Sequence, residues 1–204
     1  MALASYTDLT ASIQNWMYDR PDLAPMCGDF ISLAENAFND VLRTRQQLTT
    51  LTLSLDANGQ VAIPDDYLSF RQVTALTNPR RPLSLVAPSY RDAEMPFRMA
   101  GDPAYFTIDD GVLTVLPLTT SQIEFSYFTK IPALSEAVMT NWLLEKNPSL
   151  YLYGACKQAA VFIGDMERLN TMSAAYREAL NSFTASEELA MYSRASARAS
   201  GPTP

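Results

Sequence analysis

Residues Thr140–Asp165 read TNWLLEKNPSLYLYGACKQAAVFIGD. After Pro148 this stretch is apolar almost all round, and Lys157 and Gln158 are its clearly polar residues over most of its length. A helix at a protein surface carries one polar and one apolar side. A helix of this composition must therefore be covered on most of its sides, so the stretch predicts a central helix packed among other helices.

The ends of this helix are marked by residues with known terminal preferences. Asn147 is a good N-cap and Pro148 suits the first helical position, so the helix is predicted to start there. Gly164 can close it after Ile163, because glycine adopts the left-handed conformation common at helix ends. Asp165 is then placed to cap a last long helix.

Three further segments have helical periodicity, namely Thr7–Tyr18, Pro25–Leu42 and Met166 to about Thr184. The composition shifts from Ala185, and the end of the sequence, SRASARASGPTP, is small, polar and Pro-containing, so the last helix is predicted to end at about Thr184. In the second segment Glu35 lies mostly off the apolar stripe. The stripe predicted to be buried there consists of Met26, Phe30, Leu33, Ala34, Ala37, Phe38 and Val41.

Between the helical segments the period changes to two. Residues Leu48–Pro64 read LTTLTLSLDANGQVAIP, with leucines alternating with Thr and Ser, which predicts a half-buried strand. Asp56–Gly59 and Asp109–Gly111 predict hairpin turns, because Asn-Gly and Asp-Gly pairs accept positive φ. Further strands are predicted at 70–76, 82–86, 105–108, 112–117 and 122–129.

The order of these elements predicts an α+β fold. We expect the N- and C-terminal helix pairs, in residues 1–44 and 131–185, to form one four-helix bundle. Residues 45–130 would form an antiparallel β domain inserted between the pairs, and residues 186–204 a flexible C-terminal arm.

Composition limits the classes of function. The chain has 204 residues, 48% of them apolar, which is enough for a core. Its formal net charge of −7 argues against a sequence-reading nucleic-acid binder, although an acidic wall would let a duplex slide past. No apolar run reaches about 18 residues, and no targeting signal is recognisable, so no membrane span is expected.

Catalytic and metal chemistry find little support. The chain has no histidine, which removes the commonest general base and metal ligand. Its two cysteines, Cys27 and Cys156, lie in apolar helical patterns and are predicted to be buried, reduced thiols. The Asp56–Gly59 turn resembles the start of a calcium loop but lacks the later acidic ligands. We expect no metal, no cofactor and no catalytic residue.

Two other classes stay open as alternatives. An acid-pair hydrolase would use Asp109 and Asp110, although aspartates in turns, like the pair Asp65–Asp66, usually serve the backbone. A carbohydrate-binding module with helical flanks would need aromatic side chains exposed on the β region, and the candidates are Tyr90, Phe97 and Tyr105.

Four segments, in the same order, resemble the head-to-tail adaptor proteins of tailed bacteriophages, the tail tubular protein A-like or phage adaptor group. The most distinctive is Lys130–Leu180, with Ile-Pro-Ala-Leu, then Thr-Asn-Trp-Leu-Leu, then Pro-x-Leu-Tyr-Leu-Tyr-Gly-Ala. The others are DFISLAENAFNDVLRTRQ (29–46), VAIPDDYLSFRQV (61–73) and FTIDDGVLTVLP (106–117). The resemblance covers roughly residues 5 to 184.

This resemblance implies a structural virion protein at the head–tail interface, assembled in the host cytoplasm. Such proteins form a homo-oligomeric ring, usually a dodecamer, that docks on the portal protein, extends the DNA channel and attaches the tail or nozzle protein. A tail-side nozzle-proximal ring or stopper is the alternative within assembly proteins. The resemblance carries over no catalytic residues.

Interface residues follow from side-chain type and position. Tyr and Trp suit interfaces because they combine an apolar body with a polar tip. The C-terminal segment has apolar residues with no obvious place in the bundle, followed by arginines, as an arm that binds the portal would have. The candidates for portal or subunit contacts are Trp142, Tyr151, Tyr153, Leu189, Met191, Tyr192, Arg194 and Arg198.

Overall fold

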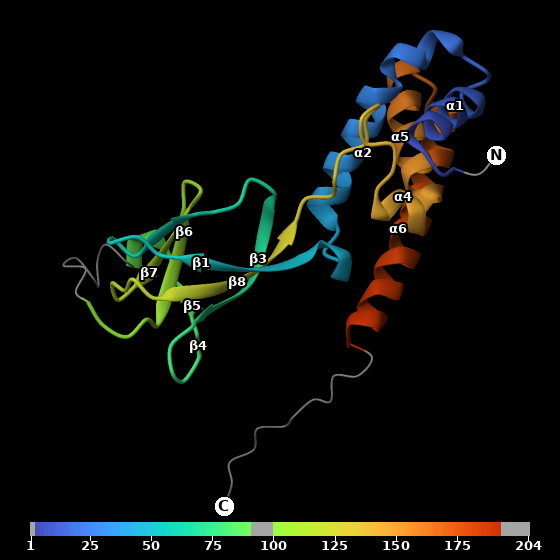
Figure 1. Cartoon of the computed structure of the whole chain (residues 1–204). Helices are drawn as coiled ribbons and strands as arrows, with labels where there is room; N and C mark the ends of the chain where they lie inside the picture. Colours follow the sequence, from blue (N-terminus) through green and yellow to red (C-terminus); the bar gives the residue numbers. More distant parts are fainter. Residues whose placement is uncertain (1–2, 91–99, 193–204) are drawn as a thin grey trace, which may run out of the picture. The chain divides into compact units, whose positions relative to one another are not determined.

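The structure is a computed structural model that describes residues 3–90 and 100–192 (Figure 1). It is an α+β fold, as predicted. The chain divides into two compact units. Residues 1–46 and 131–204 belong to a helical unit, and residues 47–130 form a β unit.

The helical unit is built around α5 (Pro148–Ile163), which packs against α1, α2, α4 and α6. This confirms that the apolar stretch is a covered central helix. The other elements are α1 (Tyr6–Trp16), the 3-10 helix η1 (Pro21–Met26), α2 (Cys27–Val41), the 3-10 helix η2 (Arg45–Gln47), α4 (Trp142–Lys146) and α6 (Met166–Tyr192).

The predicted caps of α5 and α6 are confirmed. The Asn147 side chain accepts from the backbone N–H of Leu150. Gly164 has φ of 73°, the left-handed conformation that ends α5. The Asp165 carboxylate then accepts from the Arg168 N–H at 2.9 Å, which caps α6.

Close packing of α2 on α5 depends on a glycine. A Cβ atom at Gly154 would come within 3.1 Å of the Phe38 ring and 3.2 Å of the Ala34 Cβ. The Phe38 ring also packs edge-on against Tyr151 of α5, with centroids 5.0 Å apart. Gly154 therefore lets a large aromatic residue sit directly on the backbone of α5.

The buried side of α2 differs from the predicted stripe. Leu33 and Val41 are 51% and 55% exposed, whereas Glu35 is 5% exposed. The Glu35 Oε1 accepts from the Leu134 N–H at 2.8 Å and from the Tyr151 hydroxyl at 3.0 Å. A buried carboxylate is tolerated here because two donors satisfy it.

Hydrogen bonds fasten the segment between the β unit and α4 to the helices. The Asn141 amide donates to the Tyr151 hydroxyl and to the Pro132 carbonyl, both at 2.7 Å, and its oxygen accepts from the Leu144 N–H. The Asn39 side chain accepts from the Ile131 N–H at 2.9 Å. This irregular segment is therefore held at both ends by side chains.

The β unit consists of two four-stranded sheets. One has the order β1-β8-β3-β4 and the other β2-β7-β6-β5, with antiparallel pairing except between β5 and β6. The strands are β1 (Leu48–Ser54), β2 (Gln60–Ala62), β3 (Tyr67–Ala75), β4 (Arg81–Pro82), β5 (Ser84–Leu85), β6 (Tyr105–Asp109), β7 (Val112–Leu116) and β8 (Gln122–Thr129).

One predicted hairpin forms and the other does not. Asp110 and Gly111, both at positive φ, join the paired strands β6 and β7 as expected. The Asp56–Gly59 turn also forms, but β1 pairs with β8 and β2 with β7, so this turn leads from one sheet to the other. A turn motif specifies a local reversal and leaves the strand partners to longer-range packing.

The first and last strands of the β unit are joined where the chain enters and leaves it. The Thr129 hydroxyl donates to the Gln47 carbonyl at 3.1 Å, and the Gln47 amide donates to the Thr129 carbonyl at 3.2 Å. The side chain of Gln47 is fully buried. These two bonds extend the β1–β8 ladder to the point where the chain crosses between units.

Thr107 in β6 is an exception within the β unit. Its hydroxyl oxygen is buried and has no hydrogen-bond partner in the described part of the chain. Because a buried unpaired polar group is unfavourable, Thr107→Val is expected to raise the free energy of unfolding by about 0.5–1 kcal/mol. Chemical denaturation followed by circular dichroism measures this. The paired Thr114→Val, whose hydroxyl accepts from Gln60, is the matched control and should not stabilise.

Candidate interaction surfaces

Tyr151 is not available as an interface residue. Its side chain is fully buried, and its hydroxyl bonds to Glu35 and Asn141. Burial, with the nearby Glu35 carboxylate, raises the pKa of Tyr151 well above its usual value, so the hydroxyl remains protonated. The tyrosine that was predicted to face a neighbouring copy instead completes the polar network inside the helical unit.

The two other predicted aromatic residues of this region lie nearer the surface. Trp142 and Tyr153 are partly buried and pack against the helical core. The Tyr153 ring contacts the ring of Trp16, with centroids 5.7 Å apart. Tyr153 thus joins α5 to the end of α1 while keeping part of its surface accessible.

The C-terminal residues differ from the predicted arm in part. Helix α6 continues to Tyr192 instead of ending near Thr184. Leu189 is 72% exposed and Met191 is partly exposed. Tyr192 is the last described residue of the helix, and Arg194 and Arg198 lie outside the described residues.

Glu187 explains why the helix extends beyond the predicted end. It is 5% exposed, and its carboxylate binds the ammonium group of Lys146 and lies 3.6 Å from the Arg45 guanidinium. The Phe183 ring, also buried, lies under the same ammonium group, 5.4 Å away. These contacts from α4 and η2 stabilise the end of α6, whose residues Ala185–Met191 are mostly good helix formers.

Removing this carboxylate is expected to loosen the end of α6. Glu187→Ala should increase amide hydrogen exchange in residues 185–192, by about 1–2 kcal/mol of local opening free energy, because Lys146 and Arg45 lose a shared partner. Its exposed neighbour offers the control, since Glu188→Ala should leave the exchange of these amides unchanged. Equal exchange in the two variants would show that the ion pairs do not hold the helix end.

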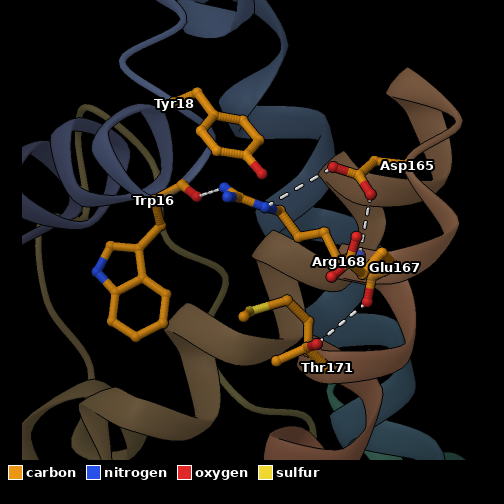
Figure 2. Close-up of a pocket in the computed structure, with 7 residues that line it drawn as sticks. Trp16, Tyr18, Asp165, Glu167, Arg168 and Thr171 are labelled. Atoms are coloured by element: carbon orange, nitrogen blue, oxygen red, sulfur yellow. Dashed lines mark hydrogen bonds and ion pairs between the residues drawn. The ribbon is translucent and has the colours of Figure 1, made fainter.

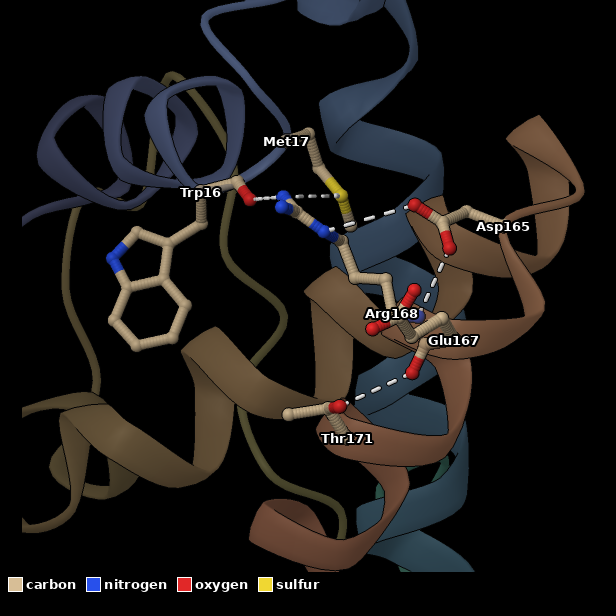
Figure 3. A network of polar contacts seen from close by, with 6 residues as sticks. All are labelled: Trp16, Met17, Asp165, Glu167, Arg168 and Thr171. Atoms are coloured by element: carbon tan, nitrogen blue, oxygen red, sulfur yellow. Dashed lines mark hydrogen bonds and ion pairs between the residues drawn. The ribbon is translucent and has the colours of Figure 1, made fainter.

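A hollow of about 210 Å³ lies where α1 ends beside the start of α6, lined by Trp16, Tyr18 and Thr171 among others (Figure 2). The Arg168 guanidinium donates to the Trp16 carbonyl, contacts Asp165 at 3.8 Å and lies 3.5 Å from the centre of the Tyr18 ring. Arg168 thus provides a hydrogen-bond donor to a backbone carbonyl at the C-terminal end of α1, where the helix itself offers none. Figure 3 shows that Arg168 contacts Trp16, Met17 and Asp165.

Backbone strain accompanies this arrangement. Tyr18 and Asp19 adopt φ of 64° and 53°, a left-handed conformation that is unfavourable for a bulky residue. Tyr18 is 71% exposed, with its ring over Arg168. The chain therefore holds an aromatic side chain at the surface in a strained conformation, next to a second exposed aromatic, Trp16.

A second hollow, of about 330 Å³, continues along the same side of α6. It is lined by Ser149 and Tyr153 on one side and by Ala175, Ala179 and Ser182 on α6. Trp16, which lines the first hollow, contacts Tyr153, which lines the second. We refer to the surface formed by Trp16, Tyr153, Thr171, Ala175, Ala179 and Ser182 as the α6 groove.

Helix α2 carries exposed apolar side chains that project from the surface. Leu33 and Val41, the two residues wrongly predicted to be buried, project from the exposed side of α2 with Ala37 between them at helical spacing. We refer to Leu33, Ala37 and Val41 as the α2 ridge. Exposed Phe162 also lies on the α2 side, where its ring contacts Phe30.

The residues named for a hydrolase, a calcium site or a carbohydrate site have structural roles or lie partly outside the described residues. Asp109 is the last residue of β6, and Asp110 lies in the β6–β7 turn. The Asp56 carboxylate accepts from the Asn58 and Gln60 N–H groups of its own turn, at 2.8 and 2.7 Å. Tyr90 is 41% exposed and contacts Tyr105, whereas Phe97 lies outside the described residues.

Both thiols are buried and form no disulfide, as predicted, and the Cys27 thiol donates to the Leu23 carbonyl at 3.3 Å. Burial raises the pKa of Cys27, and it raises that of Cys156 to about 12, so neither is a ready nucleophile. Among residues 3–90 and 100–192, no three His, Cys, Asp or Glu side chains are grouped as a metal would require. None of the helices described has both the length and the hydropathy needed to cross a bilayer.

The described residues thus include exposed apolar side chains and two hollows, but no group of metal-ligating side chains. Exposed apolar surface is typical of proteins that act through contacts with other proteins. The sequence matches the model of the SU10 adaptor protein family over residues 4–201, and the chain belongs to this family of phage head-to-tail adaptors. A structural family of this kind implies a non-enzymatic role. No curated protein matches the sequence.

Proposed function

We propose that this protein is a head-to-tail adaptor that assembles into a ring, with twelve copies as the expected number, between the portal protein and the tail. The ring would extend the DNA channel and provide the attachment surface for a tail or nozzle protein. The observation that carries the proposal is the family match, which spans nearly the whole chain.

The physical features of the helical unit support this role. We propose that α1, α2, α5 and α6 act as a four-helix bundle, which offers a rigid body for ring contacts. Exposed apolar side chains such as Leu33, Val41, Phe162 and Leu189 are costly to leave in water and suit contacts with other proteins. The net charge of −7 suits a channel that DNA crosses without sequence-specific binding.

The end of α6 is proposed as part of the portal contact. Leu189 and Met191 are accessible there, and the sequence continues with Tyr192, Arg194 and Arg198. Tyrosine and arginine are enriched among the residues that dominate binding energy at interfaces. Trp142 and Tyr153, both partly accessible, remain candidates for contacts between copies.

The length of α6 determines where a truncation that tests the C-terminal arm must end. Ending the chain after Thr184 would remove Glu187, the buried partner of Lys146, and would disturb the fold itself. Ending it after Tyr192 leaves every described contact in place. Loss of portal binding in that variant, with an unchanged unfolding temperature, is the result expected for a portal-binding arm.

Native mass spectrometry of the chain, alone and with its portal protein, tests the proposed function. We expect a complex with a portal ring in which several copies of the chain are bound in a fixed ratio. Binding to an isolated tail component but never to the portal would favour a tail-side ring or stopper. A chain that binds neither would exclude an adaptor role.

A further inference from the structure

A polar cluster near the end of α6 joins three segments that are far apart in the sequence. The Glu187 carboxylate of α6 binds the Lys146 ammonium group of α4 and lies 3.6 Å from the Arg45 guanidinium of η2. The Gln46 side chain bridges the carboxylate and the ammonium group, with its amide nitrogen 3.1 Å from Glu187 and its oxygen 2.9 Å from Lys146. We refer to Arg45, Gln46, Lys146 and Glu187 as the Glu187 cluster.

This cluster is what holds the last residues of α6 on the helical unit. Of residues 184–191, whose exposure the structure describes, Glu187 alone is buried. Phe183, one turn earlier, is the last buried apolar residue of the described part of α6, and it lies under the Lys146 ammonium group. The helix end is therefore attached through a carboxylate and its partners, and not through apolar packing.

Burial makes the segments of the cluster depend on one another. An ion pair at the surface contributes little to stability, because water screens it. The Glu187 side chain is 5% exposed, and a buried carboxylate that loses its partners has lost its contacts with water as well. The helical end of α6 is therefore favourable only while η2 and α4 keep their donors in place.

The cluster also lies next to the point at which the chain enters the β unit. Gln46 is the last residue of the helical unit before the β unit, which begins at Gln47. Gln47 is fully buried, and it exchanges two hydrogen bonds with Thr129 near the other end of the β unit. The Glu187 carboxylate thus holds the residue that directly precedes this hydrogen-bonded pair.

We propose that the Glu187 cluster couples the end of α6 to the entry of the β unit, so that the two segments become ordered together and open together. Because coupling is reciprocal, a partner that holds residues 185–192 in the helix also stabilises η2, and a change in η2 alters the stability of the helix end. The end of α6 is the part proposed to contact the portal. Resting on that proposed function, the cluster would connect portal binding with the order of the chain where the β unit begins.

Hydrogen exchange of the full chain, measured by mass spectrometry, tests the coupling from the side of α6. Glu187→Ala is expected to speed exchange about tenfold in residues 43–48 as well as in residues 185–192. Glu188→Ala, at the exposed neighbour, should change neither region. Faster exchange confined to residues 185–192 overturns the proposal. If Glu187→Ala unfolds the helical unit as a whole, Glu187→Gln, which keeps the shape of the side chain, provides the same comparison.

The reverse direction is tested from η2. A chain with both Arg45→Ala and Gln46→Ala is expected to exchange about fivefold faster in residues 185–192, although these lie some 140 residues further along the sequence. Arg71→Ala, at an exposed arginine of β3, is the control and should leave these residues unchanged. Unchanged exchange of residues 185–192 in the η2 variant would show that the coupling is absent.

The same measurement on the portal complex separates this inference from the proposed function. Portal binding is expected to slow exchange in residues 43–48 of the unmodified chain, and this effect should disappear in Glu187→Ala. Portal binding that leaves residues 43–48 unchanged, or that slows them equally in Glu187→Ala, overturns the connection with the portal. A chain that never binds portal removes the proposed function, whereas the exchange of the free chain still decides the coupling.

Discussion

Replacing Glu35 with alanine is expected to lower the free energy of unfolding by about 3 kcal/mol. The Glu35 carboxylate is the shared acceptor for the Leu134 N–H and the Tyr151 hydroxyl, all buried in the helical unit. Alanine would leave both donors without a partner and open a small cavity between α2 and α5. Urea denaturation followed by circular dichroism would measure the loss.

Glu35→Gln is the matched control, because its amide oxygen can accept the same two bonds. It should retain most of the stability lost in Glu35→Ala. If the two variants are equally destabilised, restoring an acceptor oxygen does not recover the stability, and the two hydrogen bonds are not what stabilises this site.

The pH dependence of the Glu35→Gln difference has a defined sign. Burial raises the pKa of Glu35 above its ordinary value of 4.5. The folded chain therefore keeps the proton at pH values where the unfolded chain has released it, so the stabilisation is complete below the unfolded pKa and is lost as the pH rises through the folded pKa. The unmodified chain should gain stability relative to Glu35→Gln as the pH falls from neutrality towards the unfolded pKa. A difference that is constant over this range would contradict the expectation.

Gly154→Val is expected to destabilise the helical unit by about 2–3 kcal/mol, despite the better helix propensity of valine. Its Cβ would lie within 3.3 Å of two atoms of the Phe38 ring and of the Ala34 Cβ, and the added methyl groups would need still more room. Because Phe38 also packs on Tyr151 and Tyr176, the ring cannot simply turn aside. Thermal unfolding measured by differential scanning calorimetry would report the effect.

Two controls distinguish crowding from a general effect of substitution. Gly154→Ala should be much milder, since its single methyl group needs a shift of only a few tenths of an ångström and gains helix propensity. Gln158→Val, on the partly exposed side of the same helix, should change the unfolding temperature little. A Gly154→Val chain as stable as Gln158→Val would mean that α2 can move away from α5 at little cost.

Much of the fold could be predicted from local signals in the sequence. The apolar stretch after Pro148 has no polar side to expose, so its central place in the helical unit follows from composition. Asn147, Gly164 and Asp165 mark helix ends because their side-chain and backbone preferences act over only a few residues. The segment that became β1 likewise showed the period of two that a strand has, although Leu51 is 39% exposed.

What could not be predicted depends on partners distant in sequence. Glu35 looks like a surface residue until Leu134 and Tyr151 provide its donors, and Glu187 looks like a solvated helix end until Lys146 reaches it. Leu33 and Val41 have the hydrophobicity of core residues and are exposed nonetheless. If they serve a neighbouring copy, the composition of α2 reflects an assembly that the single chain does not contain.

The two hydrogen bonds between Gln47 and Thr129 bear on how such a protein can evolve. They hold together the two points at which the chain enters and leaves the β unit, so the ends of this unit lie side by side. Insertion into a host domain is tolerated best where the two ends of the insert lie close together. A longer or shorter segment in place of the β unit would change the entropy of loop closure only slowly with its length. The β unit is therefore a segment that recombination could exchange in one event, leaving the contacts within the helical unit intact.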